Sequence, residues 1–269
     1  MGVSTQNLGY FEALSYSAYP VSVMREVLEA VKSGDMSPRE AEARLRGYVA
    51  ESAGRYDSDR WKRRGIPEAI VGEGKTPEET AELATISLET TGYVLVTRAD
   101  EATREAVRAQ LASSEPTAAI EVDERGELVS ARVGEAPSID GTVAIVTGGT
   151  ADSTPAREAK AVIEAVGGEI KLIEDVGVAA IDRLLDELES INEADVVIAA
   201  AGREGSLPTV MAGLTSSPVI ALPISSGYGI GGEGKAALYG ALQSCTVLTT
   251  VNVDAGYVAG AQAALILQV

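Results

Sequence analysis

Cys245 is the only thiol in this sequence of 269 residues, which contains no histidine. A thiolate can attack an electron-poor carbon and leave again afterwards, which makes a cysteine suitable for covalent catalysis. Because imidazole is absent, proton transfer would have to come from another group, such as a carboxylate. A lone cysteine is also often a small buried hydrophobic residue. The sequence therefore leaves Cys245 open between a catalytic nucleophile and a core residue.

Glu204 is the candidate for proton transfer, because it lies in a glycine-rich segment directly after an apolar run. The segment reads Ala201, Gly202, Arg203, Glu204, Gly205, Ser206, Leu207 and Pro208. A carboxylate at the tip of a strand is well placed for general base catalysis, and Ser206 with Pro208 can begin the next helix. The alternative is an exposed ion pair between Arg203 and Glu204, which would contribute little energy.

Two other segments have the composition of ligand-binding turns. Residues 147–155 are rich in glycine and hydroxyl groups and lead into a helix, where backbone N–H groups and the helix dipole favour a phosphate. They match neither the P-loop nor the GxGxxG pattern, so a simple capping turn is the alternative. Residues 224–232 contain several glycines and would let a flat or phosphorylated ligand approach closely, although a flexible lid without ligand contacts is the alternative there.

The elements that would position these residues alternate regularly from Gly141 onward. The predicted strands are 142–147, 169–173, 195–200, 218–222 and 247–251. The predicted helices are 155–166, 181–191, 207–214, 234–243 and 257–267. Strands that are almost wholly apolar and separated by helices indicate a parallel sheet covered on both faces. Residues 139–269 are therefore predicted to form an α/β domain with a flavodoxin-like doubly wound parallel sheet, whose ligands bind beyond the carboxyl ends of the strands.

The first half of the chain is predicted to form two smaller parts. Residues 1–53 form a helical lead-in, because apolar residues recur with helical spacing on both sides of a break at residues 33–38. Residues 54–138 form a small α/β module. Its predicted elements are a strand entrance at 67–71, a helix capped by Thr76 with Pro77 in its first turn, a strand at 93–97 and a helix at 102–111.

The small module also holds the one basic cluster of an acidic chain, at Arg60 to Arg64. These side chains could form a solvated helix face or cover the phosphates of a ligand. Lys75, which follows Gly74, is likewise either a lysine at a helix start or a phosphate contact. Both interpretations stay open for both places.

The composition excludes several classes of function. With 40 acidic and 22 basic residues, the net charge is −18 and would repel nucleic acid on average. Acidic excess combined with small apolar residues is typical of a halophilic protein, dissolved at high salt, and an ordinary acidic bacterial protein is the alternative. The sequence lacks a signal peptide pattern, a membrane-length apolar run and a cluster of zinc ligands. We therefore expect a cytoplasmic protein that binds neither nucleic acid nor membrane.

The loops of the last half of the chain resemble those of the AIR carboxylase (PurE) superfamily. The similar segments are Thr150-Ala151-Asp152, Ala201 to Pro208 and Pro218 to Pro223. Nearly the whole chain past Gly54 resembles one family within it, the LarB family of nickel-pincer nucleotide cofactor biosynthesis. The motifs that carry this resemblance are Asp57-x-x-Arg60-x-x-x-Arg64-Gly65-x-Pro67-Glu68, Gly74-Lys75-Thr76, Thr97-Arg98, Asp175 to Ala179, Gly202-x-Glu204-Gly205-x-Leu207-Pro208, Ser226 to Gly229, Ser244-Cys245 and Val251 to Asp254. Asp182 stands where that family has a histidine.

The resemblance implies a carboxylase and hydrolase of a pyridine dinucleotide. A LarB-like enzyme is expected to convert nicotinic acid adenine dinucleotide and carbon dioxide to pyridinium-3,5-biscarboxylic acid mononucleotide and AMP. The thiolate of Cys245 would add to C4 of the pyridinium ring, C5 would capture carbon dioxide, and Glu204, at the position of the family's catalytic glutamate, would move the proton. The substrate-binding residues are then Thr150, Ala151, Asp152, Gly202, Ser206, Leu207, Pro208, Ser226, Gly227, Tyr228, Gly229, Asp57, Arg60 and Lys75.

The resemblance also implies a symmetric homo-oligomer, an octamer in the superfamily, with sites near subunit boundaries. We expect carbon dioxide or bicarbonate as a co-substrate and no tightly bound cofactor, although Mg²⁺ could accompany the phosphates with Asp152 as a ligand. Two other functions stay open. An AIR carboxylase or mutase of purine biosynthesis would share the fold, but the histidine on which AIR carboxylase relies is absent. A regulatory protein could bind the nucleotide without turning it over.

Overall fold

The computed structural model describes residues 21–38, 41, 45, 49–51 and 54–269. The chain divides into two compact units between Asp59 and Arg60. The described elements of the first unit are the helix α1 (Val21–Ser33) and an antiparallel hairpin of β1 (Val49–Glu51) and β2 (Gly54–Tyr56). The helix α1 lies where the first helix of the lead-in is predicted, and the second predicted helix lies largely outside the described residues.

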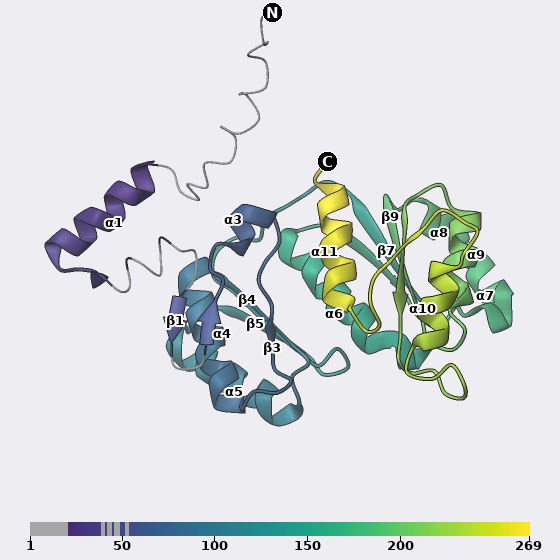
Figure 1. The fold of residues 1–269 in the computed structure, drawn as a ribbon, viewed down its shortest axis with the longest axis horizontal. Helices are drawn as coiled ribbons and strands as arrows, with labels where there is room; N and C mark the ends of the chain where they lie inside the picture. Colours follow the sequence, from purple (N-terminus) through teal and green to yellow (C-terminus); the bar gives the residue numbers. More distant parts are fainter. Residues whose placement is uncertain (1–20, 39–40, 42–44, 46–48, 52–53) are drawn as a thin grey trace, which may run out of the picture. The chain divides into compact units, whose positions relative to one another are not determined.

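The second unit begins with a four-stranded mixed sheet (Figure 1). Its strands, in spatial order, are β3 (Ile70–Val71), β4 (Tyr93–Thr97), β6 (Leu128–Arg132) and β5 (Ala119–Asp123). The pair β3–β4 is parallel and the other two pairs are antiparallel. The helices of this part are α3 (Arg60–Arg64), α4 (Pro77–Thr91) and α5 (Glu101–Ser114).

Local sequence chemistry explains the start of α4, whereas it does not reveal β5. Thr76 accepts a hydrogen bond from the backbone of Glu79, whose side chain bonds back to the Thr76 N–H, and Pro77 occupies the first turn. The hairpin of β5 and β6 is not among the predicted elements. No residue of β5 is buried, so this edge strand carries little of the apolar pattern from which strands are predicted.

The doubly wound sheet of five strands follows, and all its strand pairs are parallel. In spatial order its strands are β11 (Thr249–Thr250), β10 (Val219–Pro223), β9 (Val196–Ala201), β7 (Thr142–Thr147) and β8 (Glu169–Ile173). Its helical elements are η2 (Thr150–Asp152), α6 (Ser153–Val166), η3 (Val178–Ala180), α7 (Ile181–Asp186), α8 (Leu188–Asn192), α9 (Ser206–Leu214), α10 (Lys235–Leu242) and α11 (Gly256–Leu267). Numbered along the chain, the order is 2-1-3-4-5, which confirms the predicted flavodoxin-like fold.

Alternate residues of the central strands supply two separate cores. On one face, Ile145 and Ile198 pack with small residues of α6 and α11. On the other face, Val146 and Val197 pack with side chains that include Leu184 of α7, Ile191 of α8 and Leu207 of α9. Leu95 and Leu128 of the four-stranded sheet belong to the first core as well, so α6 and α11 form a layer between the two sheets.

Two predicted elements differ from those observed. The helix predicted at 181–191 is interrupted at Glu187, so α7 and α8 are separate short helices. The strand predicted at 247–251 is reduced to Thr249 and Thr250, because β11 pairs with β10 on one side only and over two residues. In the described part of the chain, every helix is too short or too polar to span a bilayer.

Candidate functional site

The region at the carboxyl ends of β7 and β9, where the strand order reverses direction, is called the crevice. The strand β8 lies on one side of β7, whereas β9, which comes next along the chain, lies on the other side. Loops after β7 and β9 therefore leave the sheet in opposite directions, and ligands of doubly wound domains bind at this switch point. The glycine-rich segments 147–155 and 201–208 are the two loops that line it.

Asp152 joins three loops at this crevice. Asp152 is 6% exposed, and its carboxylate accepts hydrogen bonds from the Ser226 hydroxyl (2.8 Å) and the Gly149 N–H (3.0 Å). Burial raises the pKa of the Asp152 carboxyl, and these bonds, with one from the Gly202 N–H, oppose the rise. A Cβ atom at Gly202 would lie 2.4 Å from the Ser226 hydroxyl, so a larger residue there would displace the hydroxyl that Asp152 binds. Asp152 therefore holds the loops after β7, β9 and β10 in register.

The turn after β7 has features of both interpretations offered for it. The carboxylate of Asp152 caps the Gly149 N–H, as in a simple capping turn. Thr150 and Ala151 are exposed at the outer side of the same turn. The first turn of α6 adds a further anchor, because the Ser153 hydroxyl donates to Glu174 (2.5 Å). The loop is therefore a preformed turn that leaves two of its three predicted contact residues accessible.

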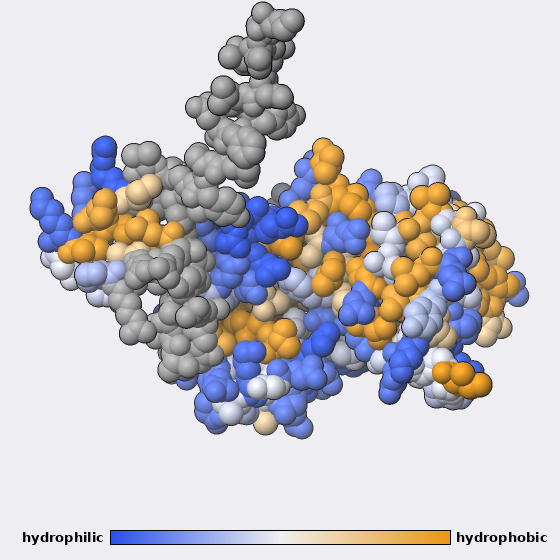
Figure 2. All heavy atoms as spheres, viewed as in Figure 1, coloured by the Kyte–Doolittle hydropathy of each residue, from blue (hydrophilic) through white to orange (hydrophobic). Residues whose placement is uncertain are grey.

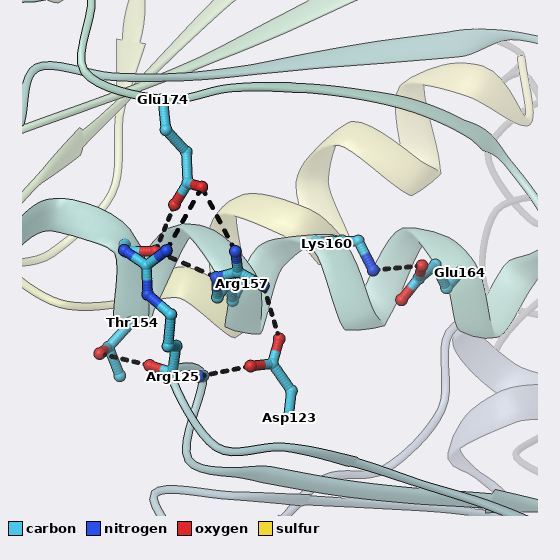
Figure 3. Close-up of polar contacts among 9 residues, drawn as sticks. Asp123, Arg125, Thr154, Arg157, Lys160, Glu164 and Glu174 are labelled. Atoms are coloured by element: carbon cyan, nitrogen blue, oxygen red, sulfur yellow. Dashed lines mark hydrogen bonds and ion pairs between the residues drawn. The ribbon is translucent and has the colours of Figure 1, made fainter. Parts of the chain in front are cut away.

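A polar bridge holds the start of α6 against the turn between β5 and β6 (Figure 3). Arg157 of α6 lies between Asp123 (3.0 Å) and Glu174 (3.3 Å). The Thr154 hydroxyl donates to the Arg125 carbonyl oxygen (2.8 Å). The four-stranded sheet is thereby bonded to the helix that begins at the crevice.

The loops after β9 and β10 approach each other closely. A Cβ atom at Gly227 would lie 3.0 Å from the backbone nitrogen of Arg203, and the Arg203 guanidinium lies over the Tyr228 ring at 4.0 Å from its centroid. Tyr228 is 77% exposed, and the predicted contact residues Ser226 and Gly229 are exposed beside it. The pair of Arg203 and Tyr228 thus presents a cation and an aromatic ring next to the crevice.

Glu204 is exposed and ionised at neutral pH. Its carboxylate accepts a hydrogen bond from the Ser206 hydroxyl at 2.6 Å. This bond, with smaller contributions from the residue's own N–H and from Arg203, lowers the pKa of Glu204. Leu207 and Pro208, which follow, are buried in α9 against the sheet. A charged Glu204 can accept a proton, and the two apolar residues contribute packing at this place.

Cys245 is exposed on the loop between α10 and β11. The Thr209 hydroxyl of α9 donates to the Ser244 hydroxyl (3.0 Å), which is also bonded to Thr246 (2.7 Å). The Glu204 carbonyl oxygen would lie 2.7 Å from a Cβ atom on Gly240 of α10. The two candidate catalytic residues therefore flank the packed pair of helices, Glu204 before α9 and Cys245 after α10. Cys245 precedes the edge strand β11, however, whereas the crevice loops follow β7 and β9.

The remaining predicted contact residues lie in other places. Asp57 belongs to the first unit. Arg60, on α3, forms an ion pair with Glu68 at 2.7 Å and lies 5.7 Å from the centroid of the Tyr257 ring. Lys75 lies on the loop after β3, and its ammonium donates to the carbonyl oxygen of Val71, the last residue of that strand, at 2.9 Å.

Arg98 and Asp254 are not among the predicted site residues, although both lie in the motifs that carry the family resemblance. The Arg98 guanidinium donates to the Asp254 carbonyl oxygen at 2.8 Å, and the Asp254 carboxylate accepts from the Ser225 N–H at 2.9 Å. Both residues have positive φ, 51° and 54°, a conformation that is uncommon without glycine. Sequence spacing predicts neither the left-handed conformations nor the contact, which joins positions 156 residues apart.

Among the described residues, no group of three or more carboxylates or thiols is arranged to hold a metal ion. Asp152 already uses both carboxylate oxygens as acceptors for protein donors. A divalent cation at the crevice would have to compete with these donors for the Asp152 oxygens.

Comparison with known protein families separates the five-stranded sheet from the hairpin of β1 and β2 and the four-stranded sheet. Residues 142–269 match the AIR carboxylase family, and residues 49–130 match the LarB/PurE-like N-terminal domain. The chain is 34% identical over 257 residues to the uncharacterized protein MJ0165 of Methanocaldococcus jannaschii, covering 91% of this chain and 97% of that protein. It is also 33% identical over 119 residues to N5-carboxyaminoimidazole ribonucleotide mutase of the same organism, covering 42% of this chain and 71% of that enzyme.

Proposed function

Because this chain belongs to the AIR carboxylase superfamily, as a LarB-like protein with a LarB/PurE-like N-terminal domain, we propose that it carboxylates and hydrolyses nicotinic acid adenine dinucleotide. The products would be pyridinium-3,5-biscarboxylic acid mononucleotide and AMP. The observation that carries the proposal is the exposed thiol of Cys245, on a loop bonded to the helix that Glu204 precedes. Family membership supports a carboxylase-type enzyme, and the exposed thiol supports a mechanism in which a cysteine bonds covalently to the substrate.

A thiol is needed because the pyridinium ring is not nucleophilic enough to be carboxylated directly. Such a ring is poor in electrons, so its C5 does not attack carbon dioxide. Addition of the Cys245 thiolate forms a sulfur–C4 bond and moves an electron pair onto the ring nitrogen, which gives a dihydropyridine. Its C5 is then an enamine carbon that forms a bond to carbon dioxide. Loss of the C5 proton and departure of the thiolate restore the aromatic ring, so atoms and electrons balance without an oxidant.

Glu204 would accept the C5 proton. Its lowered pKa keeps it charged at neutral pH, so it is in the right protonation state although it is a weak base. A weak base suffices here because proton loss restores aromaticity. The following Ser206 hydroxyl, bonded to the carboxylate at 2.6 Å, orients it.

The crevice would hold the phosphates and a base of the dinucleotide. Thr150 and Ala151 offer accessible groups at the turn after β7, and the Tyr228 ring offers a flat face for stacking. Any Mg²⁺ would arrive with the phosphates, since Asp152 is engaged by protein donors. Bicarbonate or carbon dioxide is the co-substrate, and a cytoplasm that accumulates salt suits a chain with a net charge of −18.

A second copy of the chain would complete the site. Figure 2 shows apolar residues on the surface over α10 and α11. The exposed large hydrophobic residues nearest to Cys245 in the sequence are Tyr239 (60% exposed), Leu242 (63%) and Val247 (95%). Such a gathering of exposed apolar residues marks an interface. A symmetric assembly could bring the crevice of one copy to the thiol of another.

The test combines product analysis with intact mass. Purified protein at high salt is incubated with nicotinic acid adenine dinucleotide, bicarbonate and Mg²⁺. AMP and a dicarboxylated mononucleotide should appear, and Cys245→Ala should abolish both without lowering the melting temperature. The matched control is Thr246→Val, beside the thiol, which should retain product formation. Full activity of Cys245→Ala would refute the proposal.

A purine mutase is the second candidate, favoured by the similarity to N5-carboxyaminoimidazole ribonucleotide mutase. That function predicts that N5-carboxyaminoimidazole ribonucleotide, and not the dinucleotide, raises the melting temperature. The chain has no histidine for the proton transfers of such a reaction, which is why we place it second. Tight binding of the dinucleotide without any product would instead indicate a regulatory protein.

A further inference from the structure

Arg98 occupies an unusual position at the end of β4. Its φ of 51° places a non-glycine residue in the left-handed region, a conformation that persists only where the surroundings impose it. The Gly72 N–H donates to the Thr97 carbonyl oxygen at 2.8 Å, and a Cβ atom at Gly72 would lie 3.1 Å from the Arg98 carbonyl oxygen. The loops after β3 and β4 thus hold the backbone that aims this side chain.

The Arg98 side chain reaches three other segments. Its guanidinium donates to the Asp254 carbonyl oxygen at 2.8 Å, lies 3.4 Å from the Glu73 carboxylate and lies 4.0 Å from the Glu158 carboxylate. Glu158 is 5% exposed on α6, and it accepts hydrogen bonds from the backbone N–H groups of Gly256 and Tyr257. Those groups are at the start of α11, whose N-cap residue, Ala255, makes no side-chain hydrogen bond to them.

Asp254 connects Arg98 to the loop after β10. Its N–H donates to the Pro223 carbonyl oxygen (2.9 Å), and its carboxylate accepts from the Ser225 N–H (2.9 Å). The next residue, Ser226, donates to Asp152 at 2.8 Å. Asp152 in turn accepts from Gly149 and Gly202. An unbroken series of hydrogen bonds and peptide bonds therefore runs from β4 to the crevice.

We propose that Arg98 is a positioning residue through which the four-stranded sheet sets the geometry of the crevice. By holding Asp254, it fixes the loop of residues 224–232 against Asp152 and keeps the loops after β7, β9 and β10 in the spacing that a ligand meets. The identity of that ligand as a dinucleotide rests on the proposed function. The role of the four-stranded sheet is then to complete the site and not only to cover α6.

Arg132 provides a matched control on the same sheet. Its guanidinium donates to the Ala165 carbonyl oxygen at 2.7 Å, near the last residue of α6. It joins the same two layers with the same type of bond, but at the opposite end of α6 from the crevice. Removing either arginine costs stability, whereas only removal of Arg98 should loosen the loops that carry Asp254 and Ser226.

The first measurement is backbone hydrogen exchange of the ligand-free protein. In Arg98→Ala, peptides that cover residues 224–232 and 252–256 should exchange about tenfold faster than in the native protein, and Arg98→Lys should lie between the two. In Arg132→Ala these peptides should keep the native rate. Equal protection of both peptides in Arg98→Ala and the native protein would overturn the proposal.

The second measurement separates positioning from general weakening. Arg98→Ala should weaken dinucleotide binding, measured by calorimetry, about fivefold to tenfold, while kcat at saturation changes less than about twofold. Combined with Ser226→Ala, its effect should be less than additive, because both substitutions interrupt one series of contacts. Additive effects, or equal losses in Arg132→Ala, would contradict it. A native protein that binds no dinucleotide would refute the proposed function, and the exchange rates would still decide the role of Arg98.

Discussion

Close packing of α6 on α11 makes Gly260 the most informative position for a stability test. A Cβ atom there would lie 2.5 Å from the Ala159 carbonyl oxygen and 2.9 Å from its Cα, both backbone atoms of α6. The two helices form the layer between the sheets, and they lead from the turn after β7 and the loop that holds Asp254. Gly260→Ala must therefore push apart two elements on which the crevice depends.

The expected loss follows from two opposing terms. Overpacking a tight core costs about 1–3 kcal/mol, and a clash with backbone, which cannot rotate away, belongs at the upper end. Alanine in place of glycine inside a helix returns about 1 kcal/mol. The net loss is about 2 kcal/mol, which corresponds to a fall in melting temperature of about 4–8 °C for a unit of this size.

Gly213 is the matched control, because it also lies in a helix but a Cβ atom there would meet no other atom within 4 Å. Gly213→Ala should leave the melting temperature unchanged or raise it by up to about 3 °C, since only the helix propensity changes. Thermal unfolding followed by circular dichroism, at equal salt for all three proteins, measures both. A Gly260→Ala protein as stable as the native one would show that the two helices can separate without cost and would refute the packing argument.

Three further predictions concern charge, stacking and assembly. Burial raises the pKa of Asp123, but hydrogen bonds from Gly126 and Arg157 outweigh this effect and lower it, and the pKa of Glu174 is lowered chiefly by a hydrogen bond from Ser153. The stability that both carboxylates contribute should be complete above their ordinary pKa values of 3.8 and 4.5 and lost as the pH falls through the lowered pKa values of the native protein. The melting temperature of Glu174→Gln should therefore fall less than that of the native protein between about pH 5 and pH 2. Tyr228→Ala should weaken dinucleotide binding in calorimetry by about tenfold, as expected when one base loses its stacking partner, and an unchanged affinity would remove Tyr228 from the site. Leu242→Asp and Val247→Asp should each reduce the mass seen by light scattering and lower turnover, whereas an unchanged mass would exclude this surface as the interface.

The doubly wound sheet could be predicted because its strands are apolar on both faces. The bounds of β7, β8 and β4 coincide with the predicted ones, since β7 and β4 are short apolar runs and β8 alternates charged with apolar residues over its first four positions. The hairpin of β5 and β6 could not be predicted in the same way. Its outer strand is exposed, and what holds its turn is the contact of Asp123 with Arg157, 34 residues away.

The crevice could be predicted as a set of loops but not as a set of contacts. Loop composition identified the segments that contain Asp152, Glu204 and Ser226, because strand tips rich in glycine suit ligand binding. The bond between Ser226 and Asp152 spans 74 residues, and the bond between Arg98 and Asp254 spans 156. Such pairs depend on which strands become neighbours, which periodicity within one segment does not encode.

The position of Cys245 along the sheet limits which part of a bound dinucleotide its thiol can reach. The crevice loops follow β7 and β9, whereas Cys245 precedes β11, which lies three strands from β7. At about 4.8 Å per strand, the lateral distance alone is about 14 Å. A pyridinium ring bonded to Cys245 and a base seated over Asp152 would therefore lie at different places along one bound dinucleotide. The extended dinucleotide could reach from one place to the other within one chain, an arrangement that the bond between Thr209 of α9 and Ser244 beside the thiol supports, or a neighbouring copy could deliver the thiol across the exposed apolar residues near Cys245.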